Sequence, residues 1–144
     1  MHQALTLARK AQAAGEVPVG AIVVLEDAVV GTGVNRSIQN KDPTAHAECE
    51  ALREAARRLG NYRLPGTTLF VTVEPCMMCV GAMVHARVSQ LVFGTREPKA
   101  GAIISNVQAL QFSHWNHDIE YTEGILAKES KQLMQEFFRS RRIA

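Results

Sequence analysis

The stretch TTLFVTVEPCMMCVGAMVHAR, residues 67–87, decides the fold class of this chain. Its first part, residues 67–73, is an apolar run that predicts a strand. Pro75 then begins a helix that continues to about Arg87, because proline is favoured at the first helical position. A short strand follows at residues 90–93. A strand, a helix and a strand in close succession indicate an α/β domain.

The sequence before this stretch predicts one helix and a β-hairpin. Apolar residues recur on one face of residues 1–14, which is the pattern of an amphipathic helix, and Gly15 ends it. Two apolar runs, 18–25 and 28–34, predict strands that a tight two-residue turn connects. Because a hairpin is antiparallel, we expect a mixed sheet rather than a purely parallel one.

A second helix is predicted over residues 44–59, after a polar loop at residues 35–44. Asp42 and Pro43 are interpreted as its N-cap and its first helical residue. Gly60 is expected to end this helix, because glycine adopts the left-handed conformation at a helix terminus without strain.

The C-terminal third is less regular. Residues 94–117 mix Gly, Ser and Asn with scattered apolar residues and favour no one type of element. A fifth strand is predicted at residues 119–122. A last helix begins at Ile125, and its apolar side chains toward the core are Leu126, Leu133, Met134 and Phe137. Together the elements predict a single domain over residues 1–144, an α/β fold with a mixed five-stranded sheet in a three-layer α/β/α arrangement.

The composition is that of an ordinary globular protein and argues against several classes. Hydrophobic residues make up 47% and charged residues 21% of the 144 residues. No run approaches the ~20 apolar residues of a membrane span, and the first ten residues lack the apolar segment of a signal peptide. Three cysteines fit poorly with a secreted disulfide framework. We therefore expect a cytoplasmic protein that does not enter a membrane.

Three side chains, His46, Cys76 and Cys79, have the chemistry of metal ligands. Cys76 and Cys79 lie three residues apart in the first turn of a predicted helix, so both thiolates can point the same way. His46 lies in the first turn of its own predicted helix, and two helix N-termini, which favour negative charge, can converge on one cation. Ligands of these types select zinc, and three of them leave a fourth position open for water, as in catalytic sites.

Glu48 adds a carboxylate to this set. It lies two residues after His46, about 200° around an ideal helix, so the two side chains can converge only over the helix start. A carboxylate there is placed to shuttle protons for a metal-bound water. The segments HAE, residues 46–48, and PCMMC, residues 75–79, form the H-x-E…P-C-x-x-C signature of zinc nucleobase deaminases.

Two other interpretations of the cysteines stay open. Cys49 lies three residues after His46 and could complete a closed, structural four-ligand zinc site, although it fits more simply as a core residue. Alternatively, the C-x-x-C pair could be a redox motif. That interpretation leaves His46 and Glu48 without a purpose.

Over almost its whole length, residues 4–142, the chain resembles bacterial tRNA-specific adenosine deaminases of the TadA type, within the cytidine deaminase-like superfamily. The zinc signature alone indicates the superfamily, and the flanking segments narrow the resemblance to the family. These segments are EVPVGA (16–21), NR (35–36), DPTAHAE (42–48), NYRL (61–64), TVEPC (72–76), CVGAMVHAR (79–87), VFG (92–94), NH (116–117) and FFRSRR (137–142).

The resemblance implies a fold, a cofactor and a reaction. It implies the cytidine deaminase-like fold and one Zn²⁺ per subunit, held by His46, Cys76 and Cys79, with Glu48 as the catalytic proton shuttle. The implied reaction is the hydrolytic deamination of adenosine to inosine at the wobble position of the tRNA-Arg anticodon. Members of the family are homodimers that bind the anticodon stem-loop near the subunit interface.

The same resemblance gives roles to further residues. Asn35 matches a residue that hydrogen-bonds the flipped nucleotide, and Val17 and the Ala47 backbone match the pocket wall. Glu97 stands where Asp is common, at a position that contacts the ribose. The other departures are Cys49 in place of an aliphatic residue and an Ile pair at 103–104 where small residues are frequent. The chain also begins inside its first predicted helix, so we allow for a first turn that the sequence lacks.

The last predicted helix bears on the choice of substrate. Residues 128–144 hold five Lys or Arg and two acidic residues, a net charge of +3 against +2 for the whole chain. Phe138 and Arg141 could combine base stacking with phosphate contacts, or the arginines could form a solvated helix end above a core Phe137. The alternative function, deamination of free guanine, cytosine or nucleosides, needs the same zinc site. A catalytically silent RNA-binding module would not need Glu48.

Overall fold

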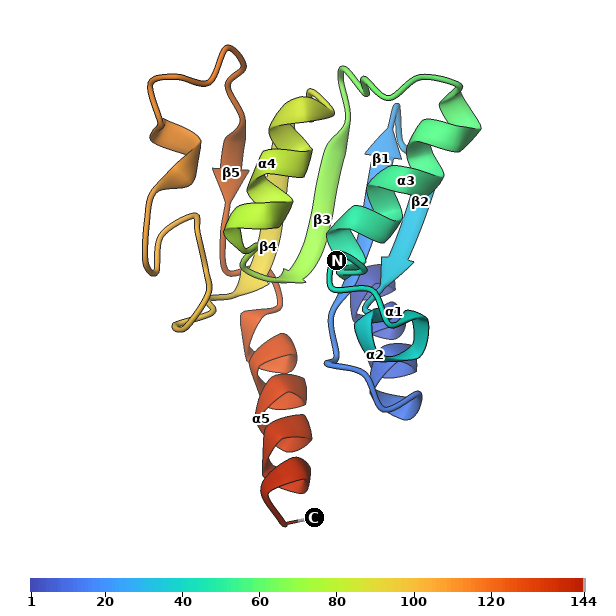
Figure 1. The fold of residues 1–144 in the computed structure, drawn as a ribbon, viewed down its shortest axis with the longest axis vertical. Coiled ribbons are helices and arrows are strands. Elements are labelled where there is room, and N and C mark those ends of the chain that lie inside the picture. The colour runs from blue at the N-terminus through green and yellow to red at the C-terminus, as the bar shows by residue number, and fades with distance from the viewer. Residues whose placement is uncertain (144) are drawn as a thin grey trace.

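The computed structural model describes residues 1–143 and contains one mixed five-stranded sheet (Figure 1). The order across the sheet is β2-β1-β3-β4-β5. β1 pairs antiparallel with β2 and β3, whereas the β3–β4 and β4–β5 pairs are parallel. The bounds are β1 Gly20–Leu25, β2 Ala28–Val34, β3 Thr68–Val73, β4 Gln90–Thr95 and β5 Glu120–Thr122. The predicted mixed sheet and its five strands are confirmed.

Two helical layers cover the sheet. α1 (His2–Ala13) and α5 (Ala127–Ile143) contact each other and pack on one face. α3 (Ala47–Leu59) and α4 (Met77–His85) also contact each other and lie on the opposite face (Figure 1). The predicted three-layer α/β/α arrangement is therefore confirmed. Among residues 1–143, no helix has both the length and the apolar character needed to cross a bilayer.

The strand directions place four strand ends at one edge of the sheet. Because only β1 runs the opposite way, the carboxyl ends of β2, β3, β4 and β5 lie at the same edge (Figure 1). In open α/β sheets, ligands bind outside the carboxyl ends of the strands. This edge is therefore where a site is expected.

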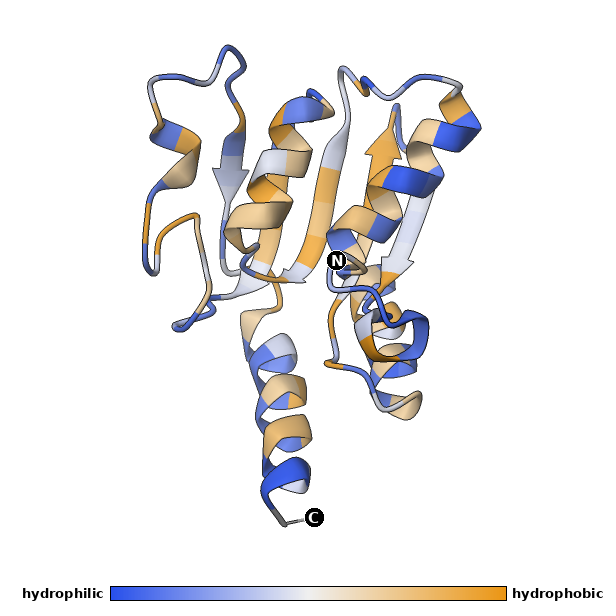
Figure 2. Ribbon diagram, in the orientation of Figure 1, coloured by the Kyte–Doolittle hydropathy of each residue, from blue (hydrophilic) through white to orange (hydrophobic). Residues whose placement is uncertain are grey.

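The core lies between the central strands and the two helical layers. β1 and β3 carry the strongest hydrophobic character in the sheet (Figure 2). Inward-facing residues such as Val71, Leu91 and Phe93 are fully buried. Gly33 of β2 allows α3 to approach closely, because a Cβ there would collide with the Ala47 carbonyl. The first turn of α3 is thereby seated directly on the sheet.

The start of α3 corrects one prediction. Asp42 and Pro43 do not begin the helix; it begins at Ala47, and His46 is its N-cap. The Asp42 carboxylate instead accepts hydrogen bonds from the backbone N–H of Thr44 (2.8 Å) and from its hydroxyl (2.7 Å). Asp42 thus closes a local turn ahead of the helix, an arrangement that competes with N-capping in Asx-type sequences.

The loop predicted at residues 35–44 contains a one-turn helix, α2 (Ser37–Asn40). The buried Glu16 carboxylate accepts hydrogen bonds from the N–H groups of Ile38 (3.1 Å) and Gln39 (2.7 Å). It satisfies the free donors at the helix start from a position more than twenty residues away in the chain. A local pattern could not indicate this contact.

The segment without a predicted element is mostly irregular. β4 extends to Thr95, two residues beyond its predicted end, and a 3₁₀ turn, η1, occupies Ala109–Gln111. The Trp115 indole N–H donates to the Ala109 carbonyl at 2.7 Å and holds this turn in place. Leu133 and Phe137 of α5 are buried as predicted, and Leu126 and Met134 are partly buried against the core.

Candidate active site

The predicted metal ligands converge at the carboxyl edge of the sheet. His46 is the N-cap of α3, Cys76 is the N-cap of α4, and Cys79 follows in the first turn of α4. His46 Nδ1 lies 3.6 Å from the Sγ of Cys76 and 3.6 Å from the Sγ of Cys79. The three ligand atoms all lie within 4.8 Å of one another, so this group could hold a metal ion.

The chemistry of this donor set fits zinc. Hydrogen bonding to Cys79 and His46 lowers the pKa of Cys76 to about 4, so this sulfur is available as a thiolate. The backbone N–H of Cys79, in the first turn of α4, also lowers the pKa of Cys76, in keeping with the preference of helix N-termini for negative charge. Two cysteine sulfurs and one imidazole nitrogen are ligands that select zinc over magnesium or calcium.

Cys49 lies beside the set without belonging to it. Its Sγ is 3.9 Å from the Sγ of Cys79, but it is not part of the group of ligand atoms that all lie within 4.8 Å. Its side chain is buried. The described residues therefore favour a three-ligand site with a neighbouring core thiol over a closed four-ligand site.

Glu48 reaches the same place despite its position on the helix. His46 has an extended backbone (φ −74°, ψ 153°), so its side chain is not tied to the 100° spacing of helical residues. This resolves how two residues on opposite helix faces can converge. Glu48 is only 4% exposed, and burial, with a contribution from the Cys76 thiolate, raises the pKa of Glu48 to about 7. A carboxyl with this pKa can both accept and donate a proton near neutral pH.

Asn35 joins the end of β2 to the start of α3. Its side-chain oxygen accepts a hydrogen bond from the Ala47 N–H at 2.7 Å, which satisfies the first donor of the helix. Its own N–H donates to the Val19 carbonyl at 3.3 Å. Val17 lies two residues before Val19 and packs, partly buried, against the core. Asn35, Ala47 and the metal ligands are therefore held in one small region.

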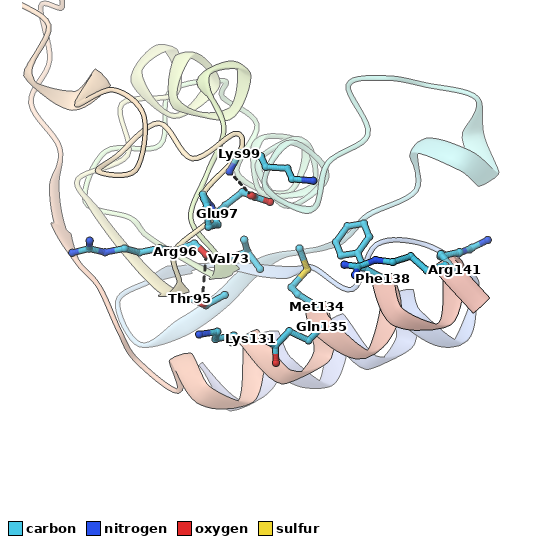
Figure 3. Close-up of a pocket in the computed structure, with 12 residues that line it drawn as sticks. Val73, Thr95, Arg96, Glu97, Lys99, Lys131, Met134, Gln135, Phe138 and Arg141 are labelled. Atoms are coloured by element: carbon cyan, nitrogen blue, oxygen red, sulfur yellow. Dashed lines mark hydrogen bonds between the residues drawn. The ribbon is translucent and has the colours of Figure 1, made fainter. Parts of the chain in front are cut away.

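The other predicted contacts line a separate cleft. A cavity of about 620 Å³ lies between α5 and the loop after β4, and Glu97, Phe138 and Arg141 all border it (Figure 3). Its floor includes Val73 at the end of β3, three residues before Cys76. The basic residues that line it are Lys99, Lys131, Arg141, Arg142 and Arg96, whose guanidinium pairs with Glu123. The structure thus groups the predicted residues into a metal-binding set and a cationic cleft.

The aromatic pair of α5 divides its roles between core and cleft. Phe137 is buried, whereas Phe138 is 41% exposed and borders the cleft. The Arg141 guanidinium lies 4.8 Å from the Phe137 ring centre and donates to the Gly15 carbonyl. Arg141 therefore already makes contacts within the chain, and Phe138 is the ring that is free to stack.

Glu74 is a residue whose role the sequence did not indicate. It is 3% exposed at the end of β3, and it accepts hydrogen bonds from the loop after β4. Burial raises the pKa of this carboxyl, but hydrogen bonds, led by those from Ser105, outweigh burial and hold the pKa below its usual value. Its only signal in the sequence is an acidic residue directly after a buried apolar strand.

Known proteins resemble the chain over nearly its whole length. The family model for MafB19-like deaminases matches residues 1–142. A curated relative from Haemophilus influenzae, a tRNA-specific adenosine deaminase, is 50% identical over 99% of this chain and 83% of its own length. A structure from a study of A-to-I editing by tRNA:A34 deaminases at the wobble position of transfer RNA is 40% identical, with a TM-score of 0.90 over 92% of this chain and 96% of that one. A guanine deaminase from Nitrosomonas europaea is 28% identical, with a TM-score of 0.76 over 94% and 81%.

Proposed function

Since the chain belongs to the family of tRNA-specific adenosine deaminases, we propose that it converts adenosine to inosine at the wobble position of a tRNA anticodon, that of tRNA-Arg. The reaction consumes one water and releases one ammonia. The observation that carries the proposal is the buried Glu48 carboxyl, held at the start of α3 beside the His46, Cys76 and Cys79 donor atoms. This combination supplies the ligands for a metal ion and a proton carrier for hydrolysis.

His46, Cys76 and Cys79 would hold one zinc ion per subunit. When bound, zinc supplies a Lewis acid that makes water a competent nucleophile at neutral pH. Glu48 then accepts a proton from the attacking water, delivers one to the purine ring nitrogen and assists the departure of ammonia from C6. A pKa of about 7 suits both directions of transfer.

The surroundings of the metal set would bind the flipped nucleotide. The Asn35 oxygen is occupied by Ala47, which leaves its amide N–H₂ to donate to the substrate. Val17 and the Ala47 backbone would form the pocket wall. In the cleft, Glu97 would contact ribose, Phe138 would stack on a neighbouring base and Arg141 would contribute positive charge.

The cleft favours a nucleic acid over a free base. A cavity of about 620 Å³ exceeds what a single purine needs, and a free base offers no phosphate to the basic side chains that border it, chiefly Lys99, Lys131 and Arg142, since Arg96 pairs with Glu123 and Arg141 donates to Gly15. The remaining expectations follow the family. Each subunit would be a single domain, and two subunits would form a homodimer that binds the anticodon stem-loop near the subunit interface. Three free cysteines suit the reducing cytoplasm.

The decisive experiment offers four substrates to the zinc-loaded protein. We expect inosine and ammonia from an anticodon stem-loop with a wobble adenosine, and far lower rates with free adenosine, guanine and cytidine. A stem-loop with guanosine at the wobble position controls for ammonia from other sources. Turnover of free guanine at a rate above that of the stem-loop would replace the proposal with the free-base alternative.

A further inference from the structure

The loop after β4 is folded around one buried carboxylate. Glu74 Oε1 accepts the N–H of Glu97 at 3.0 Å and the Ser105 hydroxyl, and Oε2 accepts the N–H groups of Ile103 (3.0 Å), Ile104 (2.8 Å) and Ser105 (3.0 Å). Within residues 1–143, no Lys or Arg forms an ion pair with Glu74. The loop's own backbone therefore provides the polar contacts that make burial of this charge tolerable.

The fit of the loop to Glu74 is close. A Cβ at Gly101 would collide with the Glu74 carboxylate, so the backbone can approach only because residue 101 has no side chain. Within the loop, Asn106 donates to the carbonyls of Pro98 and Gly101, both at 3.1 Å. Glu74 thus fixes the position of the loop, and Asn106 fixes its shape.

The same loop forms one wall of the cationic cleft. Glu97 and Lys99 border the cleft opposite Phe138 of α5, and the Lys99 N–H donates to the Glu97 carboxylate at 2.8 Å (Figure 3). The Glu97 N–H is itself one of the donors to Glu74. One hydrogen bond therefore links the buried Glu74 carboxylate directly to Glu97, the residue expected to contact the ribose.

We propose that Glu74 is a positioning residue for substrate recognition: it sets the place of the Glu97–Lys99 wall and thereby the affinity for the tRNA substrate. The inference rests on the proposed function. Glu74 also directly precedes Pro75 and Cys76, and the Ala102 N–H of the same loop donates to the Pro75 carbonyl at 2.8 Å. If Glu74 only supported the turn that carries Cys76, its loss would affect metal binding. If it positions the Glu97–Lys99 wall, its loss affects substrate affinity.

Glu74→Gln separates these two roles. Glutamine keeps the size of the side chain and one acceptor oxygen but presents an N–H₂ group where the second oxygen stood. The remaining oxygen is expected to face the three N–H donors of residues 103–105. The N–H₂ group then faces the Glu97 N–H, which loses its acceptor. We expect KM for the anticodon stem-loop to rise about tenfold, the effect of about 1.4 kcal/mol, with kcat within about twofold and zinc content unchanged. Loss of zinc or of kcat at unchanged KM would overturn the proposal.

A double-mutant cycle tests the contact between the loop and the carboxylate. Gly101→Ala should raise KM by displacing Glu74, but it should add nothing to Glu74→Ala, because the truncated side chain leaves room for the new methyl group. Additive effects would contradict the inference. Gly81→Ala is the matched control, because a Cβ at Gly81 meets nothing within 4 Å, and its KM should not change.

A readout without tRNA distinguishes failure of this inference from failure of the proposed function. Lys99 is exposed in the loop, so trypsin should cut after it faster in the zinc-loaded Glu74→Gln protein than in the parent protein. If cleavage is faster but the parent protein does not deaminate tRNA, only the proposed function fails. If the parent protein deaminates tRNA and Glu74→Gln changes neither cleavage nor KM, the positioning role fails alone.

Discussion

The side-chain oxygen of Asn35 accepts a hydrogen bond from the backbone N–H of Ala47 at 2.7 Å, so the end of β2 caps the start of α3. The capped turn carries His46 and Glu48, one residue to either side of Ala47. Asn35 therefore has two separable parts: an oxygen that supports the helix and an amide N–H₂ that can face a nucleotide.

Replacing Asn35 by Asp should keep the first part and remove the second. A carboxylate still accepts the Ala47 N–H at a helix N-terminus, so thermal stability and zinc content should stay close to those of the parent protein. Deamination should fall through a higher KM. Asn35→Ala loses the cap as well and should cost a further ~1 kcal/mol of unfolding free energy, measured by denaturant titration. Equal stability losses in Asn35→Asp and Asn35→Ala would contradict the assignment of helix support to the Asn35 side-chain oxygen.

Removing the Glu48 carboxylate should strongly reduce turnover and leave metal binding intact. Glu48→Gln and Glu48→Ala both leave His46, Cys76 and Cys79 in place, so zinc stoichiometry should remain at one per subunit. Deamination should fall by about 10²- to 10⁴-fold, the usual contribution of a positioned general acid–base group. The measurements are inosine release and zinc content on the same preparation. Turnover at normal rates would disprove the proton-shuttle role.

Cys49→Ala should keep the full zinc content. The Cys49 sulfur lies near Cys79 but outside the group that could hold the ion. Because the side chain is buried, we expect a loss of about 1 kcal/mol in stability from the small cavity, and an unchanged zinc affinity in competition with a chelator. A large fall in zinc affinity would restore the four-ligand site. Cobalt substitution gives an independent check, because its thiolate absorption reports the number of sulfur ligands.

In the metal-free protein, the contribution of Glu48 to stability should fall as the pH rises toward neutrality, against the opposite contribution of the Cys76 thiol, whose pKa is lowered. The pKa of Glu48 is raised from 4.5 to about 7 in the folded state, so between these values the folded state binds more protons than the unfolded state. The stability difference between the parent protein and Glu48→Gln should therefore change by up to about 3 kcal/mol between pH 4.5 and pH 7 and level off above pH 7. Urea titrations in the presence of a chelator test this. A difference independent of pH would show that Glu48 titrates normally.

Phe138→Ala should weaken tRNA binding while stability and zinc content stay nearly constant. Its ring is 41% exposed at the cleft, and base stacking on such a ring contributes about 1–3 kcal/mol, which corresponds to a roughly 5- to 150-fold rise in Kd. Phe137→Ala is the contrasting variant, because its buried ring should instead cost about 3–5 kcal/mol of stability. Unchanged tRNA affinity in Phe138→Ala would exclude stacking.

The sequence was sufficient for most of the fold and for the metal set, because both depend on short-range patterns. Apolar periodicity located all five strands and the four long helices to within a few residues. The spacing of Cys76 and Cys79 placed both at the start of one helix, which begins at Met77 with Cys76 as its N-cap rather than at Pro75. Contacts between distant segments were not accessible in this way. Glu16 supports α2 and Glu74 supports the loop after β4 from more than twenty residues away.

One local prediction failed for a related reason. Asp42 and Pro43 have the residue types of a helix start, but the Asp42 side chain forms a turn with Thr44 and delays the helix to Ala47. This delay makes His46 an N-cap with an extended backbone, and only there can its side chain meet that of Glu48. On an ideal helix His46 and Glu48 would point to opposite faces. They can converge because α3 begins three residues later than predicted, which leaves His46 outside the helix.

Because β2, β3 and β4 run in the same direction, the groups for chemistry and one wall of the cationic cleft follow different strands of one sheet. The metal ligands and Glu48 come after β2 and β3, whereas the Glu97–Lys99 wall comes after β4. Such an arrangement is modular. Substitutions in the Glu97–Lys99 wall can retune which molecule is admitted while the metal ligands and Glu48 stay in place, so one scaffold suits free bases in some relatives and polynucleotides in others.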